Sequence, residues 1–260
     1  MKLSICIVHY HSEKYLERFL DSLFRFPPDD DYEVLVVDNG SRVDLAKHLH
    51  QKYGDRVKVF NFGGNLGFGK AQNMVIKKAK GEYVFICNPD LELRDDSLKT
   101  LMKFAEQQRN FGIIGPKLLY DGGGVQESCR RFPSLTDLVF KRLGLTPVFK
   151  KRVGRYLMHD VNLDRAIEVD WLVGAAMMMR RKVFLELGGF DERFFLFFED
   201  TDLCRRAGEK GYSVWYHPDA RFVHTRKRLS ESEIPGMWLF QKTFWIHLGS
   251  AIKYFNKWKT

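Results

Sequence analysis

The strongest constraint on the fold is the alternation of apolar runs with helix-spaced segments over the first 115 residues. Apolar residues recur at helical spacing from Leu16 to Leu23, behind a candidate cap at Ser12. The expected strands are residues 3 to 8, 33 to 37, 57 to 60 and 83 to 87, and further helices are expected near 43 to 52, 68 to 79 and 96 to 108. Strands that alternate with helices form parallel βαβ units, which predicts an α/β chain with a doubly wound sheet.

Polar or glycine-rich residues follow each of these four strands. They are His9 and Tyr10, residues 38 to 41, residues 61 to 69, and residues 88 to 90. In doubly wound sheets the ligand binds beyond the carboxyl ends of the strands. The sequence therefore predicts that these four groups meet around one ligand.

The second half of the chain is less regular. An excursion from 118 to 165 includes Arg130 and Arg131, and such loops often cover the ligand. Regularity returns at 169 to 179, with short strands expected at 214 to 216 and 221 to 223. Trp171 and Gly174 either shape an acceptor pocket or belong to the core.

Charge separates the chain into a body and two basic attachments. The 260 residues carry a net charge of +9. Residues 141 to 155 hold six basic and no acidic side chains, and residues 226 to 260 hold seven basic and two acidic, so the remainder carries −2. A protein that coats nucleic acid spreads its positive charge over the folded body, so no nucleic-acid partner is expected.

Cysteine usage and hydropathy indicate a compartment. The four cysteines are far apart in sequence and form no C-x-x-C pair, which is typical of reduced core cysteines. No run is long enough for a signal-peptide core or for a membrane span. We therefore expect a cytoplasmic protein.

Two of the polar groups suit a nucleotide. Asp38 in V-V-D-N-G-S can accept hydrogen bonds from a base or ribose, or can form an Asx turn. Residues 63 to 69 are glycine-rich and lead into a helix that contains Asn73, where backbone N–H groups favour phosphate. The glycines do not follow the first strand, so a nicotinamide-binding Rossmann domain is disfavoured.

Acidic residues after the fourth strand and beyond residue 198 suit a metal ion and proton transfer. Asp90 in N-P-D can hold Mg²⁺ or Mn²⁺ against a diphosphate, although N-P-D is also an ordinary turn. Glu199 and Asp200 follow five apolar residues, where a carboxylate is a natural general base. The same acids could simply complement a helix dipole. His224 is a possible metal ligand or a structural histidine.

The last 25 residues predict an amphipathic helix. Trp238, Lys242, Trp245 and Lys253 lie beside its apolar stripe, which consists of Met237, Phe240, Phe244, Leu248, Ile252 and Phe255. A basic helix with tryptophan at its edges suits an anionic membrane surface. The alternative is a helix that packs on the domain and leaves its lysines in water.

Seven blocks in order resemble family 2 of the inverting nucleotide-sugar glycosyltransferases, which have the GT-A fold. They are I-C-I-V-H-Y-H-S at 5 to 12, V-V-D-N-G-S at 36 to 41, N-L-G-F-G-K-A-Q-N at 65 to 73, N-P-D at 88 to 90, G-G-F-D-E-R-F-F at 188 to 195, F-E-D-T-D-L-C-R-R at 198 to 206, and His224. N-P-D and F-E-D-x-D-L-C resemble the rhamnosyltransferase branch most.

The resemblance implies a role for each matching residue. Asp200 matches the catalytic base, with Glu199 beside it, and Asp90 and His224 match metal-site positions. The implied donor-binding residues are His9, Tyr10, Asp38, Asn65, Gly67, Asn73, Asn88 and Asp90, and the implied acceptor-binding residues are Trp171, Gly174, Arg130 and Arg131. Asn88 is neutral where the family's D-x-D has an acid, so either Asp90, His224 and the diphosphate hold the metal, or the metal is bound weakly.

The resulting hypothesis is a peripheral enzyme on the inner face of the cell membrane. It implies a GT-A domain over 1–225, with a donor half at 1–115 and an acceptor half at 116–225, and a basic helical tail at 226–260. With Mg²⁺ or Mn²⁺, it would transfer L-rhamnose from dTDP-L-rhamnose to a saccharide on a polyprenyl diphosphate. The alternatives are a galactofuranose or hexose donor, or a nucleotide-binding module without catalysis.

Overall fold

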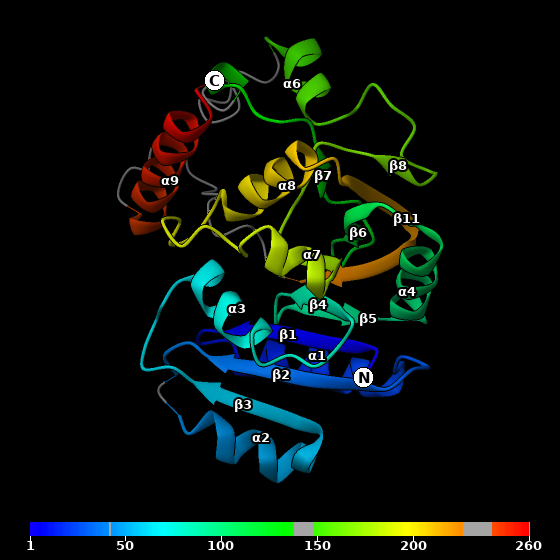
Figure 1. Ribbon diagram of the computed structural model, residues 1–260, viewed down its shortest axis with the longest axis vertical. Helices are drawn as coiled ribbons and strands as arrows, with labels where there is room; N and C mark the ends of the chain where they lie inside the picture. Colours follow the sequence, from blue (N-terminus) through cyan, green and yellow to red (C-terminus); the bar gives the residue numbers. More distant parts are fainter. Residues whose placement is uncertain (42, 138–147, 226–240, 260) are drawn as a thin grey trace.

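A computed structural model describes residues 1–41, 43–137, 148–225 and 241–259 (Figure 1). Parts of both predicted basic attachments lie outside these ranges. These parts are Lys141 and Arg142 of the excursion, and residues 226 to 240 of the tail, with Met237, Trp238 and Phe240.

The first half forms the predicted parallel βαβ units. Its strands lie in the order β3-β2-β1-β4 and are all parallel. The strands are β1 (Leu3–His9), β2 (Tyr32–Asp38), β3 (Val57–Asn61) and β4 (Tyr83–Cys87); the helices are α1 (Glu13–Arg25), α2 (Leu45–Tyr53), α3 (Phe68–Ile76) and α4 (Ser97–Gln107), with a 3₁₀ turn η1 (Gly54–Arg56) after α2. The register pairs His9 with Asp38, so two of the predicted polar groups are neighbours.

The second half makes the sheet mixed. Strand β10 (Ala176–Arg180) runs antiparallel to β4 and to β6 (Phe111–Leu119), and β11 (Ser213–His224) is parallel to β6. The short strands β5 (Leu91–Leu93) and β8 (Ile167–Glu168) both pair with β11, and β7 (Cys129–Arg130) pairs with β9 (Trp171–Leu172) in a separate sheet. The two strands expected at 214 to 216 and 221 to 223 form one strand, because β11 stays paired with β6 across an irregularity between His217 and Arg221.

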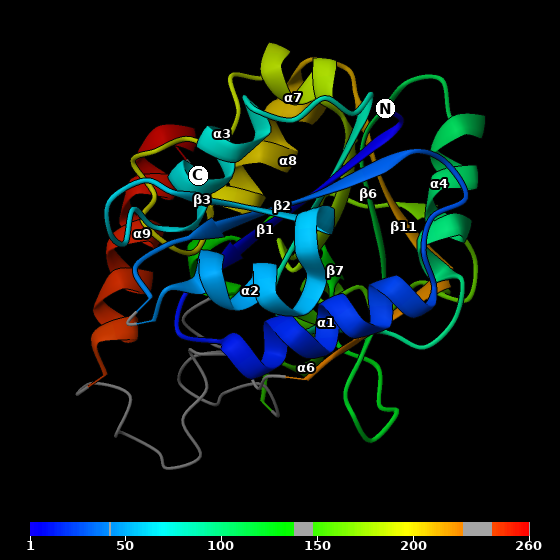
Figure 2. The same ribbon diagram turned by 90° about the horizontal axis from the view of Figure 1, so that it is seen from below.

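Helices cover both faces of the large sheet. Figure 2 shows α1 and α2 on one side of β1, β2 and β3, and α3, α7 (Arg181–Glu186) and α8 (Glu199–Glu209) on the other. In β1, Ile5 and Ile7 belong to the core on the first face, while Cys6 and Val8 belong to the core on the second. The strand is apolar throughout because both of its faces are buried.

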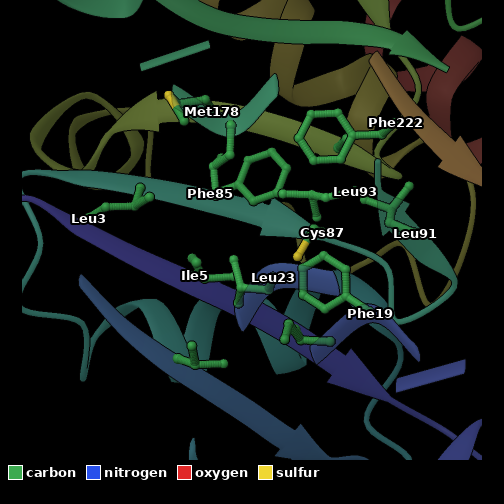
Figure 3. Close-up of a cluster of buried hydrophobic side chains, with 14 of the residues drawn as sticks. Leu3, Ile5, Phe19, Leu23, Phe85, Cys87, Leu91, Leu93, Met178 and Phe222 are labelled. Atoms are coloured by element: carbon green, nitrogen blue, oxygen red, sulfur yellow. The ribbon is translucent and has the colours of Figure 1, made fainter. Parts of the chain in front are cut away.

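The first core joins the two halves of the chain. Figure 3 shows Phe19 and Leu23 of α1 packed near Ile5 and Phe85, and Phe222 of β11 lies in the same cluster. The proposed division at residue 115 falls inside β6, so both halves share one sheet. The division into halves is therefore one of sequence order and not of separate cores.

Within the described residues, the chain also forms the helices α6 (Lys150–Tyr156) and α9 (Lys242–Trp258). Helix α9 lies beside α8 (Figure 1). Its predicted apolar stripe is divided, because Phe255 is buried with Tyr254 against Phe194 and Phe198, whereas Leu248 and Ile252 are exposed. Among the described helices, none is long and apolar enough to cross a membrane.

Candidate active site

The strand ends of the two halves meet at one edge of the sheet. Strand β10 is antiparallel, so it begins where β4 ends, and the Asn88 N–H donates to the Ala175 carbonyl at 2.9 Å. The next residue back, Gly174, donates its N–H to Asp200 Oδ2 at 2.8 Å. The adjacent residues Gly174 and Ala175 thus connect the N-P-D segment to the catalytic candidate Asp200.

Asp38 adopts the Asx turn and remains at the edge of the sheet. Its Oδ1 accepts hydrogen bonds from the N–H groups of Gly40 and Ser41, and its Oδ2 accepts one from Asn61 Nδ2 at 3.3 Å. The side chain is only 6% exposed. The turn therefore exists, and it presents the V-D-N-G-S backbone beyond β2.

His9 connects the first two loops of the site. The Ser12 N–H donates to His9 Nε2 at 3.1 Å, and His9 Nδ1 lies 3.0 Å from Ser41 Oγ. An acceptor role for Nε2 places the proton on Nδ1, and burial lowers the pKa of this imidazole. Both ring nitrogens are therefore engaged within the protein, whereas Tyr10 is exposed and packs its ring on His11.

The glycine-rich loop is held by its own asparagine. Asn65 Oδ1 accepts hydrogen bonds from Asn39 Nδ2 at 3.1 Å and from the Gly67 N–H at 3.0 Å. Gly67 has φ +82°, and a Cβ there would lie 2.3 Å from the Phe195 carbonyl oxygen. Only glycine fits, because both the backbone conformation and the contact exclude a side chain.

Asn73 faces the protein interior. Its Nδ2 donates to the Phe190 carbonyl at 2.9 Å, and its Oδ1 accepts from the Phe190 N–H at 2.8 Å. Both polar atoms of the amide are therefore used on the loop after α7. Asn73 was predicted as a donor-binding residue; in the structure it ties α3 to the loop that leads toward Asp200.

Asp90 and His224 form a buried pair. His224 Nε2 lies 3.3 Å from Asp90 Oδ1, and that oxygen has no hydrogen-bond partner among the described residues. Gln126 Nε2 donates to the His224 carbonyl, so its Oε1 accepts from His224 Nδ1 at 2.9 Å. This assignment leaves the Nε2 lone pair beside a carboxylate oxygen, an arrangement that suits a cation between them.

The donor set fits a divalent ion that shares its coordination with a substrate. No group of three or more His, Cys, Asp or Glu side chains gathers in the described parts of the chain. One carboxylate and one imidazole would leave the remaining positions to phosphate oxygens and water, as Mg²⁺ sites often do. Sequence reasoning missed Gln126, because no spacing marks a residue that orients a ligand from a loop 98 residues away in the chain.

Asp200 lies in the first turn of α8 with its carboxylate held on both oxygens. Besides the Gly174 contact, its Oδ1 accepts from the Thr201 N–H at 2.7 Å. Burial raises the pKa of Asp200, and these N–H donors and the charge of Arg130 act in the opposite direction. Burial also raises the pKa of the neighbouring Glu199 well above its usual value, and its Oε2 has no hydrogen-bond partner within the described parts of the chain.

The backbone just before Asp200 is strained. Phe197 and Phe198 have φ values of +70° and +68°, in the left-handed region that bulky residues rarely adopt. Such conformations cost on the order of 1–3 kcal/mol each and persist only where the surroundings hold them. They turn the chain abruptly into α8, so that Glu199 and Asp200 begin the helix.

Two of the predicted acceptor residues, Gly174 and Arg130, lie near Asp200, whereas the Arg131 guanidinium binds Asp160. A Cβ on Gly174 would be 3.2 Å from Asp200 Cβ, so the lack of a side chain allows the close approach. Arg130 is 8% exposed, and its guanidinium lies over the rings of Trp171 and Tyr156 at 5.1 and 5.7 Å. Trp171 Nε1 donates to the Arg131 carbonyl, which connects these residues across β7 and β9.

Comparison with known proteins defines the class. The family model for glycosyl transferase family 2 matches residues 4–188, and the chain belongs to this family. The fold agrees, since GalNAc-T7 with UDP, GalNAc and Mn²⁺ aligns with a TM-score of 0.67 at 16% identity, covering 89% of this chain. A Pyrobaculum calidifontis mannosyltransferase with GDP-Man and Mn²⁺ aligns with a TM-score of 0.59 at 19% identity, covering 88%. This chain spans 46% and 58% of those two solved chains.

Within the family, the chain is rhamnosyltransferase-like. It is 32% identical over 234 residues to an N-acetylglucosaminyl-diphospho-decaprenol L-rhamnosyltransferase of Mycobacterium tuberculosis, covering 85% of this chain and 75% of the relative. It is 28% identical over 264 residues to the rhamnosyltransferase WbbL of Escherichia coli K12, covering 96% and 91%. The protein is a glycosyltransferase enzyme with a role in polysaccharide synthesis.

Proposed function

We propose that the protein transfers L-rhamnose from dTDP-L-rhamnose to a hydroxyl group of a saccharide carried on a polyprenyl diphosphate. The main support is that two sites lie at one edge of the sheet. One is Asp200, which is held by Gly174, and the other is the Asp90–His224 pair. The first suits proton removal and the second suits a diphosphate with its cation. The rhamnosyl group is supported by the names of both rhamnosyltransferase relatives, and the lipid-diphosphate acceptor by the name of the Mycobacterium tuberculosis relative.

The proposed reaction is a single displacement with inversion. Asp200 accepts the proton of the acceptor hydroxyl, the hydroxyl oxygen bonds to the anomeric carbon, and the bond from that carbon to the diphosphate breaks. Gly174 and Thr201 hold the carboxylate through their N–H groups, so one orientation is retained during proton transfer. A divalent cation on Asp90 and His224 would neutralise charge on the departing nucleoside diphosphate.

The loops beyond β1, β2 and β3 are proposed to hold the nucleotide. Asp38 and Asn65 shape these loops, and Gly67 begins α3 where backbone N–H groups favour phosphate. In this proposal, His9 and Asn73 hold the loops of the site in place through hydrogen bonds inside the protein. The exposed Tyr10 and the partly exposed Asn88 are the residues that can contact a donor. Trp171, Arg130 and Arg131 would border the acceptor.

A donor screen tests the proposal. The purified chain would be incubated with Mn²⁺, a lipid-diphosphate acceptor bearing N-acetylglucosamine, and separate dTDP-rhamnose, UDP-hexose and UDP-galactofuranose donors. Transfer from dTDP-rhamnose alone, detected by product mass, is expected. Transfer only from a hexose would correct the donor, as the name of the 29% identical Haloferax volcanii hexosyltransferase would suggest. Transfer from no nucleotide sugar would contradict the proposal.

We also propose that α9 meets an anionic membrane surface where such an acceptor resides. Trp245 is 59% exposed and Ile252 54% exposed, with Leu248 on the same side and Lys242 and Lys253 exposed on the helix. Exposed apolar residues with flanking lysines suit the interface of a bilayer.

An Ile252→Glu substitution tests this contact. We expect less sedimentation with vesicles containing phosphatidylglycerol, because a charged side chain is costly at the acyl boundary and repels anionic lipid. Leu185→Glu, at an exposed apolar residue of α7, is the matched control. Equal sedimentation of the wild type, Ile252→Glu and Leu185→Glu would show that α9 does not contact the membrane. Point variants are preferable to deletion of 236–260, because Tyr254 is fully buried.

A further inference from the structure

The last turns of α9 are bound to the part of the chain that delivers Asp200. We call residues 191 to 198, between α7 and α8, the entry loop. Phe194 and Phe198 of this loop are buried together with Ala251, Tyr254 and Phe255 of α9. Figure 1 shows α9 alongside α8, with the loop between the two elements.

Lys257 bridges the entry loop and the catalytic helix. Its Nζ lies 2.6 Å from Asp202 Oδ1 in α8 and 2.8 Å from Asp191 Oδ2 in the entry loop. The Asp202 side chain is fully buried, and those of Lys257 and Asp191 are 20% and 14% exposed. Shielding from water makes the Coulomb attraction between these charges stronger than that of a surface pair, and loss of either partner would leave a buried charge with fewer partners. One ammonium group therefore connects three elements.

Further contacts support this junction. Trp258 Nε1 donates to Asp202 Oδ1 at 3.0 Å, and Ser250 Oγ donates to the Leu196 carbonyl at 2.8 Å. Lys253 Nζ donates to the Arg193 carbonyl at 2.7 Å. Helix α9 thus contacts the entry loop at several points along its length.

The other side of the entry loop contacts the glycine-rich loop. The Phe68 N–H donates to the Phe195 carbonyl at 3.0 Å, next to Gly67. The loop then ends in the left-handed Phe197 and Phe198 and enters α8 at Glu199. A strained turn needs support from its surroundings, and here α9 supplies it.

We infer that Lys257 is a positioning residue for the transfer reaction. By joining Asp191 to Asp202, it fixes the entry loop on α8 and thereby sets the place of Asp200 relative to the glycine-rich loop. This inference rests on the proposed function, in which Asp200 is the base. It makes the C-terminal helix part of the catalytic apparatus as well as a candidate membrane contact.

Removal of Lys257 should leave the fold intact. Asp202 Oδ2 still accepts from Arg206 Nε at 2.8 Å, and Asp191 still pairs with Arg193. Neither acid is left without a cation, so the variant loses only the bridge that Lys257 makes between α9, the entry loop and α8. A loss of kcat in a folded Lys257 variant can therefore be assigned to positioning and not to a general loss of stability.

The test compares Lys257→Met with Lys103→Met, which makes the same change at an exposed lysine of α4. We expect Lys257→Met to lower kcat about 10- to 100-fold, since displacement of a catalytic group by ~1 Å has effects of this order. Binding of dTDP, measured by calorimetry, should change much less than kcat, because Lys257 contacts Asp191 and Asp202 and not the proposed nucleotide loops themselves. Lys257→Arg should restore most of kcat, and Lys103→Met should match the wild type.

Asp191→Asn provides a second test that leaves Lys257 paired with Asp202. It should reduce kcat as Lys257→Met does, and the double variant should be no worse than either, because both remove one bridge. Wild-type kcat in both single variants, beside an inactive Asp200→Asn, would overturn this inference alone. An equal loss of dTDP binding would also overturn it, by showing general disruption. An active Asp200→Asn would overturn the proposed base itself.

Discussion

Asp200→Asn is expected to lower kcat by at least 10²-fold and as much as ~10⁴-fold, the usual range for general-base assistance. The amide keeps the size of the carboxylate but cannot accept the acceptor's proton at neutral pH. One of the two N–H donors, Gly174 or Thr201, would face the new NH₂ group, so thermal unfolding should be measured alongside. Binding of dTDP should be retained, because the hydrogen bonds of the Asp200 carboxylate go to Gly174 and Thr201 and not to the proposed nucleotide loops.

The pH dependence of kcat/KM is a second test of Asp200 as the catalytic base. Burial raises the pKa of Asp200, so a free base persists only above that raised pKa. The wild-type kcat/KM should therefore fall as pH decreases, with a midpoint above the ordinary aspartate value of about 3.9. The residual activity of Asp200→Asn should lack this acidic limb.

Glu209→Gln is the matched control for this experiment. It makes the same chemical change at an exposed residue at the end of α8, and should leave kcat and the pH profile unchanged. Near-normal turnover in Asp200→Asn, in a folded protein that binds dTDP, would assign the base to another residue.

Asp90→Ala is expected to abolish both metal-dependent donor binding and most of the activity. The carboxylate is the only acid of the N-P-D segment, and it faces the lone pair of His224 at 3.3 Å. Without it, one imidazole remains, which is too few ligands to hold Mg²⁺ or Mn²⁺ without the nucleotide. We expect Mn²⁺ to strengthen dTDP binding to the wild type in calorimetry, and to have no effect on the variant.

Asp219→Ala, at an exposed acid on the same strand as His224, should behave as the wild type. Chelation with EDTA should reproduce the Asp90→Ala phenotype in the wild type and should be reversed by added Mn²⁺. Full activity in EDTA would remove the metal from the proposed reaction, and Mn²⁺-dependent dTDP binding in Asp90→Ala would place the metal elsewhere.

Much of the donor half was predictable because its signals are local. The strand at 83 to 87 has the predicted bounds, and the others differ by one or two residues, since fully buried strands read as continuous apolar runs. The Asx turn at Asp38 was one of two predicted alternatives, and its hydrogen bonds span only three residues. Short-range chemistry of this kind is visible in a single sequence.

The second half was harder to predict because its partners are distant in sequence. The antiparallel placement of β10 brings Ala175 beside Asn88, and no periodicity encodes the direction of a strand. Gln126 meets His224 across 98 residues, and Lys257 meets Asp191 across 66. These residues look like ordinary surface polar groups until the sheet and α9 are assembled.

The sequence by itself determined the α/β class, the strand-end location of the site, and the family through motifs that lie close together in the chain. The tertiary structure alone decided that His9 and Asn73 turn their polar atoms inward, that the sheet is mixed, and that the apolar stripe of α9 is divided. The physical reason is that apolar periodicity and turn chemistry act between near neighbours. Hydrogen-bond partners and buried ion pairs depend instead on which distant segments the core brings together.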